Sequence, residues 1–130
     1  MKKYWTNAHA KYLLMIHIVW IPKYRKRILK GKIKNRIEEL LQECADVNRW
    51  KIEELNIQED HVHMVLKFHT DKSVSKIVQL FKGKTSRIIR KEFPELEEFY
   101  WGDNFWAEGY FAETVGSVSL EIIKNYVKNQ

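Results

Sequence analysis

Residues 61–68 run His-Val-His-Met-Val-Leu-Lys-Phe and predict a β-strand whose two faces differ in chemistry. Because alternate side chains of a strand point to opposite faces, one face carries only apolar side chains, which we expect to pack against helices: Val62, Met64, Leu66 and Phe68. His61 and His63 then share the other face, with their backbones roughly 6.5–7 Å apart. Two imidazoles at this spacing can converge on one cation, so the strand phase makes both histidines candidate metal ligands.

Two further strands are predicted ahead of this stretch. The apolar, β-branched run over residues 11–20 indicates a central strand. Residues 50–59 indicate another, in which a change of apolar phase at Glu53-Glu54 suggests a β-bulge. Only a short polar turn around Glu59-Asp60 separates this strand from residues 61–68, so we expect the two to form an antiparallel hairpin.

Two helices are predicted by apolar side chains that recur every three or four residues. The first has this apolar stripe: Ile33, Ile37, Leu40, Leu41, Cys44 and Val47. The second covers about residues 74–92, with Asp71 or Ser73 as its N-cap and Pro94 as its stop. An acidic, aromatic loop is expected at residues 93–104, a last strand within residues 105–115, and a C-terminal helix after Ser117 or Ser119.

The order β-α-β-β-α-β, followed by one more helix, predicts an α+β fold of the ferredoxin-like or RRM-like class. Such a fold has an antiparallel sheet with two helices on one face, which leaves the other face open for a site. A length of 130 residues fits a single domain over residues 1–130. His17, in the first strand, is expected to be either a hydrogen-bonded core histidine or a neighbour of the site across the sheet.

Basic side chains are concentrated in one part of the sequence. The net charge is +6, and eight of the 23 Lys and Arg residues lie between Lys23 and Arg36, with no acidic residue among them. In the rest of the chain the 17 acidic residues slightly outnumber the basic ones. A local basic field suits a polyanion such as nucleic acid, although a solvated loop and helix face would give the same composition.

The sequence also bears on compartment. Cys44 is the single cysteine, so no internal disulfide can form, and its place on a helix stripe indicates a buried structural thiol. No apolar run is long enough to cross a bilayer, and the N-terminal residues lead into no signal-peptide core. We therefore expect a cytoplasmic protein with no membrane partner.

The expected C-terminal helix carries a tyrosine beside its packing stripe, which is formed by Leu120, Ile123 and Val127. Tyr126 and Gln130 are four residues apart, so they project from neighbouring turns of one helix face. Spacing alone favours an amphipathic packing role for a tyrosine at such a boundary.

Taken together, these residues resemble the single-tyrosine HUH transposases of the smallest bacterial and archaeal insertion sequences (TnpA type), to which the REP-associated tyrosine transposases are related. The HUH pattern (His, hydrophobe, His) is His61-Val62-His63, and the tyrosine signature is Tyr-Val-Lys-Asn-Gln at residues 126–130. Residues 20–27, 81–87 and 109–111 are also similar. Each motif is weak by itself, but the ordered set covers most of the chain and is specific.

This resemblance implies a DNA transposase that needs a divalent metal and no ATP. Tyr126 is then the nucleophile, which cuts single-stranded DNA and holds one end as a 5′-phosphotyrosine. His61, His63 and Gln130 are then the ligands of Mg²⁺ or Mn²⁺. Members of this family recognise an imperfect hairpin near each element end. They act as homodimers, in which the tyrosine helix can serve the partner's histidines.

Two basic groups are candidate DNA contacts under this interpretation. One follows the first strand and consists of Lys23, Arg25, Lys26 and Arg27. The other is expected to share the outer face of the second helix and consists of Lys84, Arg87 and Lys91. Trp and Tyr side chains could stack on unpaired bases.

Three other classes of protein are compatible with parts of this pattern. A non-catalytic RRM-like module that binds single-stranded nucleic acid would share the topology, but it would carry aromatic residues where this strand has histidines. A replication-initiator or relaxase-like nickase would share the HUH strand, usually within a longer chain. A structural zinc protein would need more cysteines than one.

Overall fold

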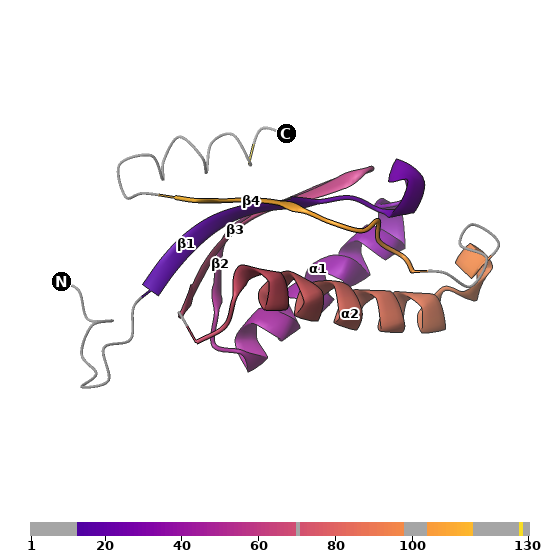
Figure 1. Cartoon of the computed structure of the whole chain (residues 1–130). Helices are drawn as coiled ribbons and strands as arrows, with labels where there is room; N and C mark the ends of the chain where they lie inside the picture. Colours follow the sequence, from indigo (N-terminus) through magenta and orange to yellow (C-terminus); the bar gives the residue numbers. More distant parts are fainter. Residues whose placement is uncertain (1–12, 70, 98–103, 116–127, 129–130) are drawn as a thin grey trace.

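The computed structural model describes residues 13–69, 71–97, 104–115 and 128 (Figure 1). Its strands are β1 (Leu13–Trp20), β2 (Lys51–Gln58), β3 (His61–His69) and β4 (Phe111–Thr114). Its α-helices are α1 (Gly31–Val47) and α2 (Val74–Glu92). Two short 3-10 turns, η2 (Lys23–Arg25) and η3 (Pro94–Leu96), follow β1 and α2.

The four strands form one sheet in the order β2-β3-β1-β4, and every neighbouring pair is antiparallel. β1 and β3 lie at the centre and pair from Leu13–His69 to Trp20–Val62. Figure 1 shows α1 and α2 side by side against one face of this sheet. This is the predicted ferredoxin-like arrangement, so the predicted fold class is confirmed. The predicted C-terminal helix lies outside the described residues, apart from Lys128.

Several local predictions are confirmed as well. The pairing of β2 with β3 shifts register between Ile52 and Glu54, which is the expected β-bulge. Ser73 caps α2, because its hydroxyl accepts a hydrogen bond from the Lys76 amide at 3.1 Å. Cys44 is buried, and burial raises the pKa of its thiol, as expected for a structural cysteine.

The predicted last strand does lie within residues 105–115, but it is shorter than this β-rich stretch. Only Phe111–Thr114 pair with β1, while residues 104–110 form an irregular segment. This segment is attached to the sheet end by an isolated bridge between Pro22 and Trp106. Phe105 and Trp106 are both buried although they are consecutive, whereas the side chains of a half-buried strand alternate between buried and exposed. The segment therefore has the aromatic composition of a strand but not its geometry.

The core lies between the sheet and the helices and is built around aromatic rings. Trp20 stacks on Phe81 at 6.0 Å between ring centroids, and Trp106 meets Trp20 edge-on at 5.9 Å. The indole N–H of Trp106 donates to the buried hydroxyl of Thr85 at 2.8 Å, which joins the 104–110 segment to α2. Within the described residues no helix is long and apolar enough to cross a membrane.

The bond between Trp106 and Thr85 gives a test of this packing. Thr85→Val keeps the side-chain shape but leaves a buried indole N–H without its acceptor, so we expect a loss of about 1–3 kcal/mol in the free energy of unfolding. Urea unfolding followed by circular dichroism measures it. In Thr85→Val combined with Trp106→Phe, the loss should be smaller than the sum of the two single losses. Additive losses would show that the bond contributes nothing.

Candidate metal and DNA-binding site

The face of the sheet opposite the helices brings three histidines together. His61 and His63 come from β3, two residues apart and therefore on one face. His17 pairs with Val65, one step along the same face, so the central strand β1 adds a third imidazole. Asn56 and Gln58 on β2 pair with His63 and His61 and complete a polar surface across three strands.

The two histidines of β3 are close enough to share a ligand. The ring centroids of His61 and His63 lie 4.6 Å apart, with the rings edge to face. Nδ1 of His63 lies 3.4 Å from Nε2 of His17. The structure therefore brings together the two predicted metal ligands, and it favours the site-neighbour alternative for His17 because His17 contacts His63 directly.

This face is more enclosed than the alternating pattern predicts, because His63 is only 6% exposed and Val65 is fully buried. Burial lowers the pKa of His63 to about 4, with smaller contributions from His61 and His17. Burial also lowers the pKa of His17, against the opposing effect of Glu113. His63 is thus neutral at pH 7, which is the state in which an imidazole binds metal.

His61 is oriented by a carboxylate. Its Nδ1 donates to Oδ1 of Asp60 at 2.7 Å, and the second oxygen of Asp60 accepts from Nε of Arg25 at 3.1 Å. Burial opposes the ionisation of Asp60, but the hydrogen bonds from His61 and Arg25 outweigh it and lower the pKa of this carboxyl. One carboxylate therefore connects the turn after β1 with the imidazole of His61.

The free side of His61 fits a cation. Its Nε2 is buried and has no hydrogen-bond partner among the described residues. An imidazole bound to a carboxylate through one nitrogen, with its other nitrogen presented to the site, is the usual arrangement of a metal-bound histidine. No group of three His, Cys, Asp or Glu that could hold a metal occurs in the described ranges, so a third ligand would be of another kind or come from elsewhere.

Tyr126 and Gln130 lie outside the described residues, but their neighbour Lys128 does not. The carbonyl of Lys128 accepts from Nδ2 of Asn56 at 3.1 Å, and its ammonium lies 3.9 Å from the Glu54 carboxylate. Both partners belong to the polar face of β2 that adjoins the histidines. The chain thus reaches the histidine face two residues from each of these predicted site residues.

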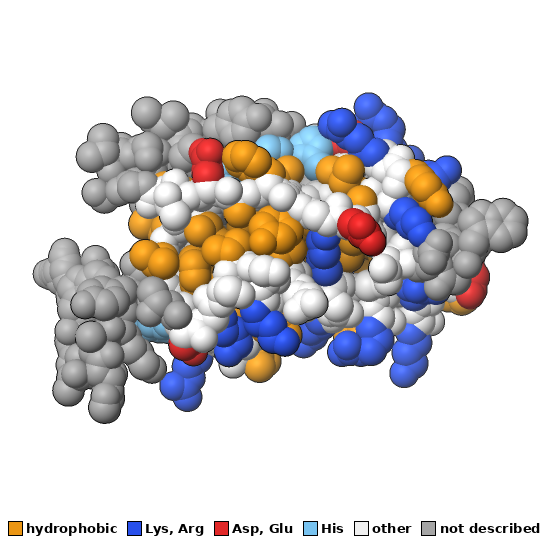
Figure 2. Space-filling view, viewed as in Figure 1, with side chains coloured by type: hydrophobic (Ala, Val, Ile, Leu, Met, Phe, Trp, Pro, Cys, Tyr) orange, Lys and Arg blue, Asp and Glu red, His pale blue; other side chains and the backbone are white. Residues whose placement is uncertain are grey.

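The structure separates the two groups of predicted DNA contacts. Arg25 and Arg27 lie beside the histidines, where they pair with Asp60 and with Glu59 (3.6 Å) in the turn between β2 and β3. Lys23 and Lys26 belong to the same basic segment. The α2 group lies in the helix layer, away from the histidines, and Figure 2 shows Lys and Arg side chains along that layer.

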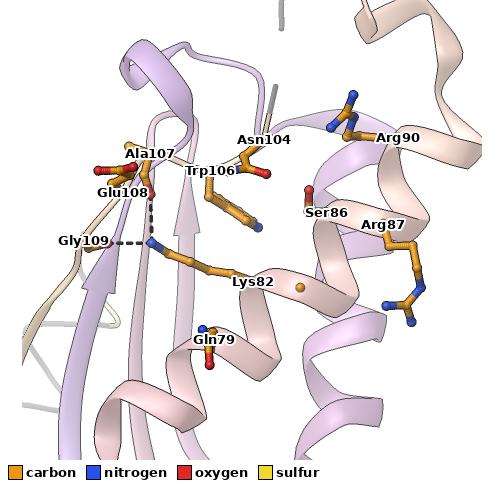
Figure 3. A pocket seen from close by; sticks show the side chains of 11 residues that line it. Gln79, Lys82, Ser86, Arg87, Arg90, Asn104, Trp106, Ala107, Glu108 and Gly109 are labelled. Carbon is orange, nitrogen blue, oxygen red and sulfur yellow. Dashed lines mark hydrogen bonds between the residues drawn. The ribbon is translucent and has the colours of Figure 1, made fainter. Parts of the chain in front are cut away.

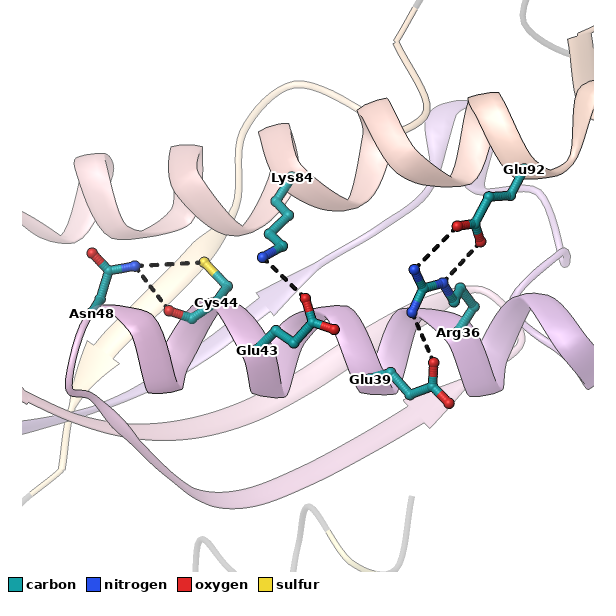
Figure 4. Close-up of polar contacts among 7 residues, drawn as sticks. All are labelled: Arg36, Glu39, Glu43, Cys44, Asn48, Lys84 and Glu92. Atoms are coloured by element: carbon teal, nitrogen blue, oxygen red, sulfur yellow. Dashed lines mark hydrogen bonds and ion pairs between the residues drawn. The ribbon is translucent and has the colours of Figure 1, made fainter.

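The expected outward face of α2 holds for Arg87 and Lys91, which are exposed, and needs a correction for Lys84. Arg87 lines a cavity together with Arg90, which the sequence pattern did not single out (Figure 3). Lys84 instead turns towards α1, where its ammonium lies 3.2 Å from the Glu43 carboxylate (Figure 4). Lys91 is exposed. Lys84 is therefore paired with Glu43 between the two helices. A spacing of three and four residues defines a broad helix face, so side chains that share this face can lie in different environments.

Two functional candidates were missed. Asp60 precedes His61 directly, and an acidic residue beside a candidate ligand was the available signal. Arg90 follows the predicted contact Arg87 by three residues, so its position one turn further along the helix could have indicated it.

Comparisons with known proteins identify a family and several proteins of similar sequence. A family model described as "Transposase IS200 like" matches residues 10–130. The transposase of insertion sequence element IS200 from Salmonella typhimurium is 32% identical over 123 residues, which are 95% of this chain and 80% of that protein. The ISDra2 transposase TnpA from Deinococcus radiodurans is 29% identical over 119 residues, covering 92% and 85% of the two chains.

Solved structures agree on the fold. A crystal structure from Deinococcus radiodurans R1, described as a transposase, superposes with a TM-score of 0.77 at 28% identity and covers 100% of this chain and 98% of its own. A REP-associated tyrosine transposase bound to a REP hairpin has a TM-score of 0.65 at 9% identity and covers 98% and 68%. At that low identity the second likeness concerns the fold alone.

The buried imidazole of His63 makes stability depend on pH. Its folded pKa of about 4 lies below the value of 6.5 expected when unfolded. The contribution of the neutral His63 to the free energy of unfolding is therefore complete above pH 6.5. As the pH falls towards 4, the free energy of unfolding decreases by about 2–3 kcal/mol, because only the unfolded chain binds the proton readily. Urea unfolding in EDTA at a series of pH values measures this loss. His63→Gln should reduce the dependence in this window, and an unchanged dependence would contradict the assignment.

The family model matches far more than half of the chain. The chain belongs to the IS200-like transposase family.

Proposed function

We propose that this transposase cuts and rejoins single-stranded DNA at the ends of its insertion sequence, with Tyr126 as the nucleophile. His61, His63 and Gln130 would hold the divalent metal. The observation that carries the proposal is the pair of adjoining imidazoles on β3, with Lys128 packed on the same face through Asn56. This contact supports the proposal because Lys128 is two residues from both Tyr126 and Gln130.

The proposed reaction exchanges one phosphate ester for another. The Tyr126 oxygen bonds to the scissile phosphorus as its hydroxyl proton leaves, and the bond from phosphorus to the 3′-oxygen breaks. The departing oxygen takes up a proton and becomes a 3′-hydroxyl. The other DNA end stays attached to Tyr126 as a 5′-phosphotyrosine, so one phosphodiester linkage has replaced another. A new 3′-hydroxyl can therefore reverse the step on another strand without ATP.

His61 and His63 are suited to hold the metal, because Asp60 fixes the orientation of His61 and burial keeps His63 neutral. When bound, a divalent ion offsets the charge of the scissile phosphate and polarises it. Two imidazoles with an amide oxygen from Gln130 tolerate Mg²⁺ or Mn²⁺.

The DNA partner follows from the family and from the charge around the site. A hairpin at the element end is the proposed substrate, in line with the REP hairpin bound by the REP-associated relative. Arg25 and Arg27 lie beside the histidines and can contact phosphates near the cut. We include in the proposal a homodimer, in which Tyr126 can serve the partner's histidines, and action in the cytoplasm.

A covalent adduct tests the nucleophile. The protein is incubated with Mn²⁺ and a single-stranded hairpin oligonucleotide taken from the DNA that flanks its gene, and is then analysed on a denaturing gel. A band of protein joined to DNA is expected, and both Tyr126→Phe and EDTA should abolish it. Tyr110→Phe removes the hydroxyl of another tyrosine and is the matched control, which should retain the band. Cleavage by Tyr126→Phe would refute this nucleophile.

Metal affinity tests the carboxylate behind His61. Asp60→Ala removes the acceptor of the Nδ1 proton and should weaken Mn²⁺ binding about 10- to 100-fold, measured by calorimetry on the DNA-free protein. Glu59→Gln alters the neighbouring acid, which pairs with Arg27 and not with a histidine, and should leave the affinity within about twofold. Equal effects of the two variants would mean that the local charge matters and the orientation of His61 does not.

A further inference from the structure

His17 lies on the central strand β1, between the histidines of β3 on one side and the edge strand β4 on the other. It is buried, with 6% of its surface exposed. Its ring stacks on that of His63 with 5.6 Å between the centroids, and it meets the ring of Phe111 edge-on at 6.2 Å. Packing on both sides therefore holds the imidazole of His17 in a defined orientation against His63.

The hydrogen bond between these two imidazoles determines which nitrogen of His63 can bind a metal. Nε2 of His17 lies 3.4 Å from Nδ1 of His63, so Nε2 is the ring nitrogen of His63 that remains for a cation. His61 is arranged in the same way, because its Nδ1 is bonded to Asp60 and its Nε2 has no hydrogen-bond partner among the described residues. Both proposed ligands are thus held through Nδ1, one by a carboxylate and the other by an imidazole.

The position of one proton decides whether His63 can be a ligand. A neutral imidazole has one N–H donor and one acceptor nitrogen. If His17 donated the hydrogen bond, the proton of His63 would be on Nε2 and would block metal binding there. If His63 donates from Nδ1, the lone pair of its Nε2 is available to the metal, and Nε2 of His17 must be the acceptor.

The charge of Glu113 favours the arrangement in which His17 accepts. Glu113 pairs with His17 across β4, on the side of β1 away from His63. Its carboxylate acts on the imidazole of His17, where it opposes the lowering of the pKa by burial. A negative charge on this side attracts the proton of a neutral imidazole to the nitrogen away from His63, which is Nδ1. Nε2 of His17 then has a lone pair directed at His63.

We propose that His17 is a positioning residue for the metal site: it accepts a hydrogen bond from Nδ1 of His63 and thereby fixes the tautomer in which His63 binds the metal. The proposal rests on the proposed function in taking His63 as a ligand. Direct coordination by His17 is disfavoured, because its Nε2 is bonded to His63. In addition, the described residues contain no group of three His, Cys, Asp or Glu that could hold a metal.

The tautomer of His63 can be measured in the metal-free protein. Nitrogen NMR of protein labelled with ¹⁵N-histidine, in EDTA at pH 7.5, distinguishes a ring nitrogen that carries a proton from one that does not. His63→Gln identifies the signals of this residue. We expect the proton of His63 on Nδ1 in the starting protein, and we expect His17→Met to move it at least partly to Nε2. A proton on Nε2 of His63 in the starting protein would overturn the proposal.

The affinity for Mn²⁺, measured by calorimetry on the DNA-free protein, connects the tautomer with metal binding. His17→Met removes the acceptor and should weaken the affinity about 10- to 100-fold. His17→Gln is the conservative rescue, because its amide oxygen can accept the bond that Nε2 of His17 accepted, and it should keep most of the affinity. His69→Met is the matched control, since it removes a histidine from the same face at the far end of β3 and should leave the affinity unchanged.

Two affinity results would overturn the proposal. Equal losses in His17→Met and His17→Gln would mean that the shape of the imidazole matters and its acceptor nitrogen does not. An unchanged affinity in His17→Met would mean that His17 does not act on the ligand. Urea unfolding confirms that each variant is folded, and the NMR measurement on the starting protein decides the tautomer without any variant of His17. If the starting protein binds no Mn²⁺ while His63 carries its proton on Nδ1, the proposed metal ligands are refuted and the tautomer set by His17 is confirmed.

Discussion

β1 and β3 pair along their whole length, and this pairing determines where the other parts of the molecule lie. It brings His17 of β1 beside His63 of β3 and directs their side chains away from the helices. It also leaves one edge of each central strand for β2 and β4, which bring Asn56 and Glu113 to the same face. A slip of one residue would exchange the two faces of β3 and put its histidines among the core aromatic rings.

Burial of His17 and His63 lowers the pKa values of their imidazoles on the histidine face of the sheet. In water, the imidazoles of His17 and His63 would each bind a proton near pH 6.5, but burial here penalises the charged forms. His61 differs in its polar contacts, because its Nδ1 is hydrogen-bonded to a carboxylate oxygen of Asp60. Two neighbouring residues of one strand thereby meet different environments, one dry and one polar. Such a contrast is common where a protein prepares a site for a charged ligand.

The sequence predicted the fold class because the apolar periods of its helices and strands were regular. It did not indicate where the last strand begins, because the aromatic side chains of Phe105 and Trp106 are buried without a regular period. The relation between His61 and His63 followed from strand phase, since local geometry determines it. The approach of His17 and the link from Arg25 to Asp60 depend on residues 35 or more positions apart, which no local pattern encodes. Likewise, helix spacing grouped Lys84 with Arg87 but could not indicate that α1 supplies Glu43 as a partner.

The carboxylate of Asp60 links binding at Arg25 to binding at His61. One of its oxygens binds Arg25 and the other binds His61, so neither partner can be displaced without altering the charge that the other experiences. A polyanion that attracts Arg25 away would leave Asp60 more basic and its bond to the imidazole stronger. Thermodynamic reciprocity then requires that whatever binds at the far nitrogen of His61 changes the affinity for that polyanion by the same factor. The turn and the imidazole are therefore linked through one carboxylate, although they belong to segments far apart in the chain.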